Sequence, residues 1–317
     1  MIWLIGNKGM LGSEVSRQLK EAKFPFVGTD KETDITDASA LENFANNVLT
    51  DSYFPSDLPH SERRITWIIN CSAYTNVEKA EEDVELAEKL NSQGPLNIAR
   101  LARKIGAKLI HISTDYVFNG KGKVPYTEEM PKEPLGIYGK TKSQGEEAIQ
   151  KEMNTYYILR TAWLYGFDGK NFVYTMTNAM NKHDAVKVVN DQKGTPTCAV
   201  DLAEIIIKII TKSKKAKGLF GKDSAPAFGI YHFTDEGETT WFEFTQEIYR
   251  LGKKYGRITN ECTVNPCTTQ EYGAKVERPS YSVLCKEKIS KELKIKIPDW
   301  QISLEKFIKN IRFASEK

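Results

Sequence analysis

Residues 2–12, IWLIGNKGMLG, join an apolar run to a glycine-rich turn. Residues 2–5 have the pattern of a short buried strand. The apolar positions after the turn indicate one face of a helix, at Leu11, Val15 and Leu19. Glycines repeat at every third position, at Gly6, Gly9 and Gly12. Their spacing differs from the Gly-x-Gly-x-x-Gly of most dehydrogenases, so the strand and the helix around them carry the argument. Glycines in that context let backbone N–H groups approach a pyrophosphate at the helix N-terminus, which predicts a dinucleotide-binding turn.

Apolar runs and amphipathic segments alternate along the rest of the chain. We predict strands at 26–29, 65–70, 109–112 and 156–160, with helices at 38–48, 84–105 and 138–153 between them. This alternation indicates an α/β fold, namely a Rossmann-like doubly wound parallel sheet. Beyond residue 166 the alternation becomes irregular, which indicates a smaller, interleaved C-terminal substrate lobe. We therefore assign 1–165 and parts of 189–235 to the dinucleotide-binding domain, and 166–188 and 236–317 to the substrate-binding lobe.

The composition of the 317-residue chain excludes several classes of protein. A net charge of +3 gives no reason to expect binding to nucleic acid or to an anionic membrane. No apolar run approaches the ~20 residues of a membrane-spanning helix, and the glycine turn at Gly6 leaves no room for a signal peptide before the first strand. The five cysteines are scattered without a Cys-x-x-Cys pair, which favours free thiols and a cytoplasmic location.

A second stretch, 109–142, carries the chemistry. Its buried-strand pattern ends in the hydroxyls of Ser113 and Thr114, and open α/β sheets bind ligands at the carboxyl ends of their strands. Tyr138 and Lys142 lie four residues apart at the start of a predicted helix, so both side chains share one face. Because a nearby cation favours the phenolate, we expect Lys142 to lower the pKa of Tyr138 from its ordinary ~10. Thr114, Tyr138 and Lys142 are the predicted catalytic residues.

Chance alone produces Tyr-x-x-x-Lys pairs on solvated helix faces, since the chain has 14 tyrosines and 45 basic residues. The hydroxyls at the end of the preceding strand and the N-terminal glycine turn favour the catalytic interpretation of this pair.

Polar residues near other strand ends are candidates for contacts with a ligand. Asp30, about 20 positions beyond the glycine turn, is placed to bond an adenosine ribose, whereas Lys31 beside it suits a 2′-phosphate. The choice between NADH and NADPH therefore stays open. Asp34 has a cofactor role or belongs to a helix cap, with Thr36 or Asp37 capping the helix at 38–48.

Three further positions have two interpretations each. Trp163 follows a strand end and is either a wall that stacks on a substrate ring or a core residue. Asn91, in the middle of a predicted helix, either bonds backbone near the site or faces solvent. Tyr74 and Thr75 follow the strand at 65–70 and are candidates to face the substrate. The polar stretch 51–64 has no functional signal and is expected to be a surface excursion.

Several runs together carry a family resemblance. Gly6, Gly9 and Gly12 with Thr114 and Tyr138-x-x-x-Lys142 resemble the extended short-chain dehydrogenases/reductases. The resemblance narrows to the dTDP-4-dehydrorhamnose reductase family through runs that share its order: CSAYT (71–75), VEKAE (77–81), STDYVF (113–118), YGKTK (138–142), LRTAW (159–163), DQKGTPT (191–197) and Arg278-Pro279. It extends from residue 2 to about 285. The family reduces the C4 ketone of dTDP-4-dehydro-L-rhamnose to dTDP-L-rhamnose, a precursor of bacterial surface polysaccharide.

This resemblance implies a role for each matching residue. Tyr138 would donate a proton to the C4 alkoxide while NADPH or NADH delivers hydride, Lys142 would bond the nicotinamide ribose, and Thr114 would polarise the ketone. Residues implied in substrate binding are Thr75, Asp115, Tyr116, Trp163 and Arg278, the last contacting phosphate or forming an ion pair within the small lobe. Residues implied in cofactor binding are Gly6, Gly9, Met10, Leu11, Gly12, Asp30, Asp34, Ile35, Ser72, Ala73, Tyr74, Tyr138 and Lys142.

The sequence departs from the family pattern at Met10, where a polar residue is usual, and this would alter one cofactor contact. Some members bind magnesium through glutamates at a dimer contact, and Glu14 lies at one such position. A solvated helix glutamate is the preferred interpretation there. The partner implied is a small nucleotide-sugar substrate, and the oligomeric state stays open, with a homodimer among the alternatives.

Related activities on the same fold are the main rivals. A sugar-nucleotide 4,6-dehydratase needs Asp-Glu after the strand-end Thr, whereas Asp115 is followed here by Tyr116. A nucleotide-sugar epimerase uses much the same Thr, Tyr and Lys, and the motifs on the substrate side disfavour it. A non-catalytic NAD(P)-binding protein that resembles the regulatory subunit of methionine adenosyltransferase is the alternative from another class. Intact catalytic positions weigh against it.

Overall fold

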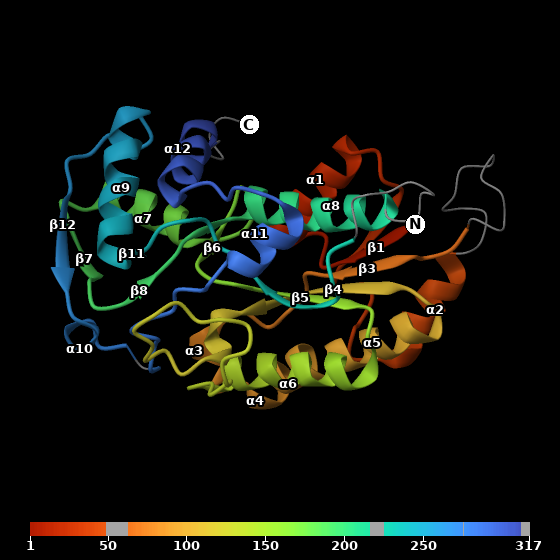
Figure 1. Ribbon diagram of the computed structural model, residues 1–317. Coiled ribbons are helices and arrows are strands. Elements are labelled where there is room, and N and C mark those ends of the chain that lie inside the picture. Colours follow the sequence, from red (N-terminus) through yellow and green to blue (C-terminus); the bar gives the residue numbers. More distant parts are fainter. Residues whose placement is uncertain (49–62, 216–224, 275, 312–317) are drawn as a thin grey trace.

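A six-stranded sheet runs through the centre of the molecule, with helices on both of its faces (Figure 1). The computed structural model describes residues 1–48, 63–215, 225–274 and 276–311. The strands are β1 (Ile2–Ile5), β2 (Phe26–Thr29), β3 (Trp67–Asn70), β4 (Lys108–Thr114), β5 (Tyr156–Thr161) and β10 (Gly229–His232). Their order is β10-β5-β4-β3-β1-β2, and every neighbouring pair is parallel. The predicted α/β fold is confirmed. The polar stretch 51–64, except its last two residues, lies outside the described residues.

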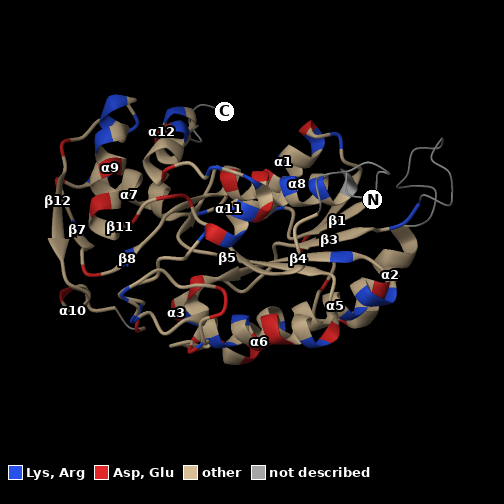
Figure 2. Ribbon diagram, in the orientation of Figure 1, with Lys and Arg blue, Asp and Glu red and all other residues tan. Residues whose placement is uncertain are grey.

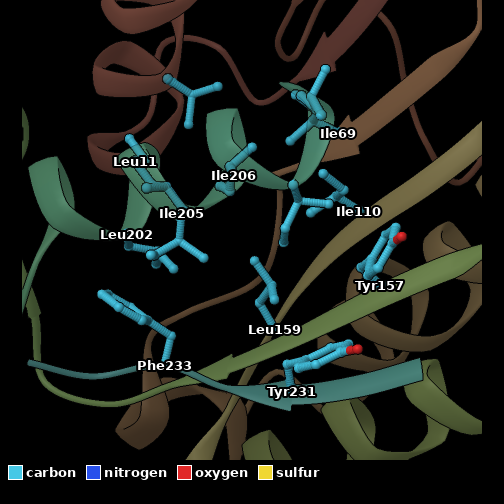
Figure 3. Close-up of a cluster of buried hydrophobic side chains, with 14 of the residues drawn as sticks. Leu11, Ile69, Ile110, Tyr157, Leu159, Leu202, Ile205, Ile206, Tyr231 and Phe233 are labelled. Carbon is cyan, nitrogen blue, oxygen red and sulfur yellow. The ribbon is translucent and has the colours of Figure 1, made fainter. Parts of the chain in front are cut away.

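The two faces of this sheet bury separate apolar cores. One core packs α1 (Met10–Glu21), α8 (Ala199–Lys215) and α11 (Glu287–Leu293) against the sheet, as Figure 3 shows for Leu11, Ile110 and Ile206. The other packs α2 (Ala38–Val48), α5 (Gly94–Lys104) and α6 (Ile137–Glu152) against the opposite face. Successive residues of a strand point to opposite faces, so Trp67 and Ile69 join the first core and Ile68 joins the second. Burial on both faces explains why these strands are short, nearly continuous apolar runs.

The predicted helix at 84–105 contains a π-helical turn. It consists of α4 (Val84–Glu88), the π turn (Lys89–Gln93) and α5. The turn carries Asn91 inward, where it is fully buried. Its Oδ1 accepts from Tyr74 N at 2.8 Å, and its Nδ2 donates to Tyr74 O at 3.0 Å. Of the two interpretations of Asn91, the structure supports the backbone contact, and π turns often occur at functional sites.

A second group of elements lies at one end of the sheet (Figure 1). It contains α7 (Phe172–Lys182), α9 (Trp241–Lys254) and α12 (Trp300–Asn310), which share a third apolar core, and the parallel pair β7 (Ala185–Val189) and β12 (Thr263–Cys267). The remaining elements are α3 (Val77–Ala80), a 3₁₀ helix (Asp115–Val117), β6 (Leu164–Tyr165), β8 (Lys193–Gly194), β9 (Thr197–Cys198), β11 (Thr239–Thr240) and α10 (Thr269–Tyr272). The division into a dinucleotide-binding domain and a substrate lobe stays a prediction.

Charged residues of both signs are interspersed on the helices, whereas the strands of the central sheet carry few of them (Figure 2). Among the described residues, no helix is both long enough and apolar enough to cross a bilayer.

Candidate active site

The strand order reverses between β1 and β3, and the glycine-rich turn follows β1 at this point. Gly6 has a φ of +77°, which favours glycine. A Cβ on Gly12 would lie only 1.9 Å from Gly6 O, so helix α1 can approach the turn this closely only with glycine there. Among the described residues, no side chain caps α1 and no acidic residue lies in its first turn. The first N–H groups of α1 therefore suit a pyrophosphate, as a dinucleotide requires.

Helix α6 lies unusually close to its neighbours because of two glycines. A Cβ on Gly139 would lie 2.2 Å from Tyr116 O, and one on Gly145 would lie 2.1 Å from Asn91 O. This close contact holds the first turn of α6 beside the carboxyl end of β4, so that Tyr138 and Thr114 face one another. The ring of Tyr138 meets that of Tyr116 edge-on, with centroids 5.4 Å apart.

The pKa of Tyr138 is raised to about 12 because burial outweighs the opposing effect of the neighbouring Thr114 hydroxyl, and Asp115 raises it further. The expectation that Lys142 lowers this pKa is wrong for this structure. Lys142 is almost fully buried, and its Nζ donates to Ile112 O at 2.6 Å and lies 3.3 Å from His111 Nε2. Burial lowers the pKa of Lys142 itself to about 8, against the opposing effect of Glu146. A lysine whose amine is directed at β4 does little to favour a phenolate at Tyr138.

Asp115 is the other titratable group at this strand end. Burial raises its pKa to about 6, although hydrogen bonds from Thr114 and Ser282 oppose the shift. Thr114 Oγ1 donates to Asp115 Oδ1 at 2.9 Å, while Oδ2 is buried and has no partner among the described residues. Burial also raises the pKa of Tyr116 well above its ordinary value. The predicted substrate residues Asp115 and Tyr116 thus lie together beside Thr114 and Tyr138.

The structure supports a core role for part of Trp163, and its role as a wall against a substrate ring stays a prediction. It is only partly buried, follows β5, and has a φ of +48°, which is rare for a bulky residue. Its ring stacks on Trp241 with centroids 3.6 Å apart and packs on the third apolar core. A Cβ on Gly194 would lie 2.6 Å from this ring, so β8 covers it closely. A strained backbone at a strand end is typical of functional sites.

The remaining predicted substrate residues are less directly placed. Thr75 is exposed, and Tyr74 donates its hydroxyl proton to Asp83 Oδ2 at 2.8 Å. Arg278 forms an ion pair with Glu78 of α3 at 2.7 Å. The ion pair expected within the small lobe is therefore wrong, because Glu78 belongs to the N-terminal part of the chain. Arg278 Nε is buried without a partner among the described residues, which leaves one donor for a ligand.

Among the candidate residues after β2, Asp37 has a structural role, and cofactor contacts of Asp30 and Asp34 stay predictions. Asp30 lies at the end of β2, and its backbone N donates to Glu32 Oε1 at 3.0 Å. Asp34 Oδ1 accepts from Thr36 N at 2.8 Å, and Asp37 Oδ1 accepts from Ser39 N at 2.8 Å, so Asp37 takes the capping role at α2.

Three candidates for cofactor contact are partly structural. The side chain of Ile35 is buried in the second core, and Met10 packs against the first core and the glycine-rich loop at Gly166. Ser72 donates from both N and Oγ to Asn70 Oδ1, at 3.0 and 2.6 Å.

Glu14 is not the solvated glutamate expected from the sequence. It is 6% exposed, and its Oε2 accepts from Arg17 Nε at 3.0 Å, because it lies where α1 faces α8. Gln18 Nε2 donates to its other oxygen at 2.8 Å. Within the ranges that the structure describes, no three His, Cys, Asp or Glu side chains gather as a metal-ligand set.

Sequence reasoning missed a buried polar network beneath the catalytic residues. Arg160 of β5 and Glu146 of α6 form a two-bond ion pair, and Ser113 Oγ donates to Glu146 Oε1 at 2.6 Å. Asn70 and His111 lie at neighbouring positions on β3 and β4, with Nδ2 and Nδ1 3.1 Å apart. Two residues in the sequence could have indicated this network: Arg160, a charged residue at the end of an apolar strand, and Glu146, one helical turn beyond Lys142.

Comparisons with known proteins agree with this geometry. The family model described as the RmlD substrate binding domain matches residues 1–313. A dTDP-4-dehydrorhamnose reductase of Clostridium acetobutylicum has a similar structure, with 39% identity, a TM-score of 0.83, and coverage of 97% of this chain and 98% of that one. The Bacillus anthracis enzyme of the same name was solved in complex with NADP. It is 33% identical, with a TM-score of 0.82, and the match covers 96% of this chain and 97% of that one. A dTDP-4-dehydrorhamnose reductase of Streptomyces griseus is 38% identical over 285 residues, which are 89% of this chain and 84% of that protein.

Proposed function

The chain belongs to the RmlD substrate-binding-domain family, and we propose from this that it is an NAD(P)H-dependent dTDP-4-dehydrorhamnose reductase. It reduces the C4 ketone of dTDP-4-dehydro-L-rhamnose to the alcohol of dTDP-L-rhamnose. The observation that carries the proposal is the meeting of Thr114, Tyr138 and Lys142 at the sheet edge that also holds the glycine-rich turn. Relatives that share the whole fold at 33–39% identity bear the name of this reductase, and one of them was solved with NADP.

The residues present fit the cofactor and its chemistry. The N-terminus of α1 and the turn at Gly6, Gly9 and Gly12 would hold the pyrophosphate, and Asp30 or Lys31 would contact the adenosine ribose or its 2′-phosphate. Bound NADPH or NADH supplies the hydride for the ketone carbon. Lys142, on the same face of α6 as Tyr138, would bond the nicotinamide ribose. We propose no metal for the reaction, since Glu14 is committed to Arg17 and Gln18.

Tyr138 acts as the general acid in this mechanism. With its pKa raised to about 12, the phenol is fully protonated at neutral pH. It remains a much stronger acid than the alcohol that the reaction forms, so proton transfer from Tyr138 to the developing alkoxide is downhill. Thr114 donates a hydrogen bond to the same oxygen and thereby stabilises its negative charge. Thr114 must turn from Asp115 Oδ1, its present partner at 2.9 Å, to do so.

The surroundings of Asp115 favour reduction over dehydration. A 4,6-dehydratase would need a second carboxylate beside Asp115, and Tyr116 occupies that position with its ring against Tyr138. Asp115, Tyr116, Thr75 and Trp163 would line the sugar pocket, and the partner-free Nε of Arg278 would contact a phosphate. The five cysteines, all in described parts of the chain, are free thiols, in keeping with the cytoplasmic location that we propose. The homodimer stays a prediction.

The proposal is tested by oxidation of NADPH in the presence of dTDP-4-dehydro-L-rhamnose. We expect turnover in the wild type and a loss of about 10²-fold or more in Tyr138→Phe. Tyr249→Phe is the matched control, since Tyr249 on α9 bonds Glu261 at 3.0 Å, outside the site. Cofactor binding without turnover in the wild type, or equal turnover in the two variants, would contradict the proposal.

A further inference from the structure

The catalytic helix α6 begins at a residue that cannot cap it. Its N-cap residue is Gly136, which has no side chain to accept a capping hydrogen bond. The first N–H groups of a helix have no partner within the helix, so a first turn without a cap frays easily. Tyr138, the proposed general acid, is the second residue of this turn. Its position therefore depends on what else holds the start of α6.

Glu81 supplies this cap from a different part of the chain. Its Oε1 accepts a hydrogen bond from Ile137 N, the first N–H of α6, at 2.8 Å. Glu81 is the C-cap residue of α3, which lies beside the start of α6 although Glu81 and Ile137 are 56 positions apart (Figure 1). A carboxylate is favourable there, because the N-terminus of a helix carries a partial positive charge.

Gly136 makes room for this carboxylate. A Cβ added at Gly136 would lie 2.6 Å from Glu81 Oε1, whereas the next atoms that it would meet, in Glu81 and Val276, are 3.8 Å away. The backbone of Gly136 is extended, with φ −133° and ψ 175°, which is an ordinary N-cap conformation. The approach of Glu81, and not the backbone, therefore favours glycine at this position.

Helix α3 is itself held at several points, so Glu81 acts from a fixed base. The side chain of Asn76 caps α3 by accepting from Lys79 N at 3.0 Å. Glu78 forms the ion pair with Arg278 at 2.7 Å. These bonds tie α3 to the chain on either side of it, so that the cap restrains α6 more than α6 restrains α3.

We propose that Glu81 is a positioning residue for Tyr138: its carboxylate caps α6 from outside and holds the first turn so that the phenol faces Thr114. The inference rests on the proposed function, because Tyr138 is the general acid of that reaction. Lys142, one turn further along α6, is held separately through its hydrogen bond to Ile112 O at 2.6 Å. Loss of the cap should therefore displace Tyr138 more than Lys142.

The first test measures amide hydrogen exchange at Ile137. Glu81→Ala removes the acceptor, so exchange at Ile137 N should become about 10-fold faster or more. Glu81→Gln keeps a carbonyl oxygen and should retain most of the protection. Glu82→Ala, which removes the neighbouring exposed carboxylate, is the matched control and should leave exchange at Ile137 unchanged. Equal exchange in the wild type and in Glu81→Ala would overturn the inference.

The second test separates kcat from KM in the NADPH-dependent reduction. Because a misplacement of about 1 Å can cost up to ~10²-fold in rate, we expect kcat to fall about 10-fold or more in Glu81→Ala. KM for the sugar nucleotide and for NADPH should stay within about twofold of the wild type, since proton donation by Tyr138 is made only in the transition state. Glu81→Gln should retain most of the wild-type kcat. An unchanged kcat in Glu81→Ala, or a loss confined to KM, would refute a positioning role.

A compensating substitution gives the sharpest test. Gly136→Ser alone should lower kcat, because its Cβ would lie 2.6 Å from Glu81 Oε1. That contact is absent when Gly136→Ser is combined with Glu81→Ala, and serine is a preferred N-cap residue whose hydroxyl accepts from the second or third N–H of a helix. The double variant should therefore recover most of the kcat lost in Glu81→Ala. A double variant no more active than Glu81→Ala would contradict the inference.

The inference and the proposed function fail separately. Glu81 is exposed, so its variants should fold, and exchange at Ile137 is measured without substrate. A wild type without turnover on dTDP-4-dehydro-L-rhamnose would count against the proposed function, whereas unchanged exchange in Glu81→Ala would count against the cap alone.

Discussion

Breaking the buried ion pair between Arg160 and Glu146 should cost far more stability than breaking an ion pair of the same geometry on the surface. Arg160 Nε and Nη2 donate to the two oxygens of Glu146 at 2.8 and 2.7 Å. Their side chains are 1% and 0% exposed. Arg160→Met would leave the carboxylate of Glu146 buried with Ser113 Oγ at 2.6 Å and Lys132 Nζ at 3.6 Å as its remaining partners.

The expected cost is about 3–5 kcal/mol in the free energy of unfolding, the range for removing one member of a buried pair. This loss of stability arises because the buried carboxylate of Glu146 is left without its main partner, and not because the attraction between the two charges is itself large. Replacing both residues, as in Arg160→Met with Glu146→Leu, should therefore recover most of the loss.

Equilibrium urea unfolding measures these differences, and Arg250→Met provides the control. Arg250 Nε and Nη2 also donate to both oxygens of Glu247, at 2.7 and 2.6 Å, but the arginine side chain is 59% exposed. Its loss should cost less than about 1 kcal/mol. Equal costs for Arg160→Met and Arg250→Met, or a double variant that is no more stable than Arg160→Met, would refute the argument.

Three further predictions concern the site. Gly12→Ala should destabilise the protein and abolish the increase in melting temperature that NADPH gives, because the added Cβ would lie 1.9 Å from the backbone oxygen of Gly6. Gly9→Ala is the control and should retain the fold, because its Cβ would meet nothing closer than 3.4 Å. The pKa of Asp115 is about 6 in the folded chain against an ordinary 3.8, so the folded state loses stability as the pH rises from 3.8 to 6. The free energy of unfolding of Asp115→Asn, measured in urea, should therefore exceed that of the wild type by about 3 kcal/mol at pH 8 and equal it at pH 3.5. Thr114→Val should lower kcat by about 10²-fold, whereas Thr114→Ser, which keeps the hydroxyl, should retain most of the wild-type kcat. Equal losses of kcat in both variants would contradict a role for the hydroxyl.

Much of the fold follows from local patterns in the sequence. The apolar runs at β1 and β3 are long enough to be recognised because a parallel sheet buries both faces of its strands. Helix α7 (Phe172–Lys182) likewise has a local start signal, since the Asn171 side chain caps it by accepting from Tyr174 N. By contrast, β12 (TVNPC) has neither alternation nor a continuous apolar run, and it becomes a strand only by pairing with β7.

The sequence indicates candidate site residues but not their electrostatics. Spacing on a helix places Tyr138 and Lys142 on one face, but it does not tell which way the Lys142 amine turns or how deeply the phenol is buried. Burial of the phenol, reinforced by Asp115, raises the pKa of Tyr138 to about 12, opposite to the predicted direction. Asn91 likewise reaches Tyr74 through a π turn, which no periodicity in the sequence indicates.

In the proposed reaction, this chain transfers hydride to C4 of a dTDP-4-keto sugar and Tyr138 supplies the proton. The most direct measurement is the product formed from dTDP-4-dehydro-L-rhamnose with NADPH deuterated at the transferred position. We expect one deuterium on C4 of dTDP-L-rhamnose, and no such product above background from Tyr138→Phe. Deuterium at another carbon, or unlabelled product from active enzyme, would contradict it.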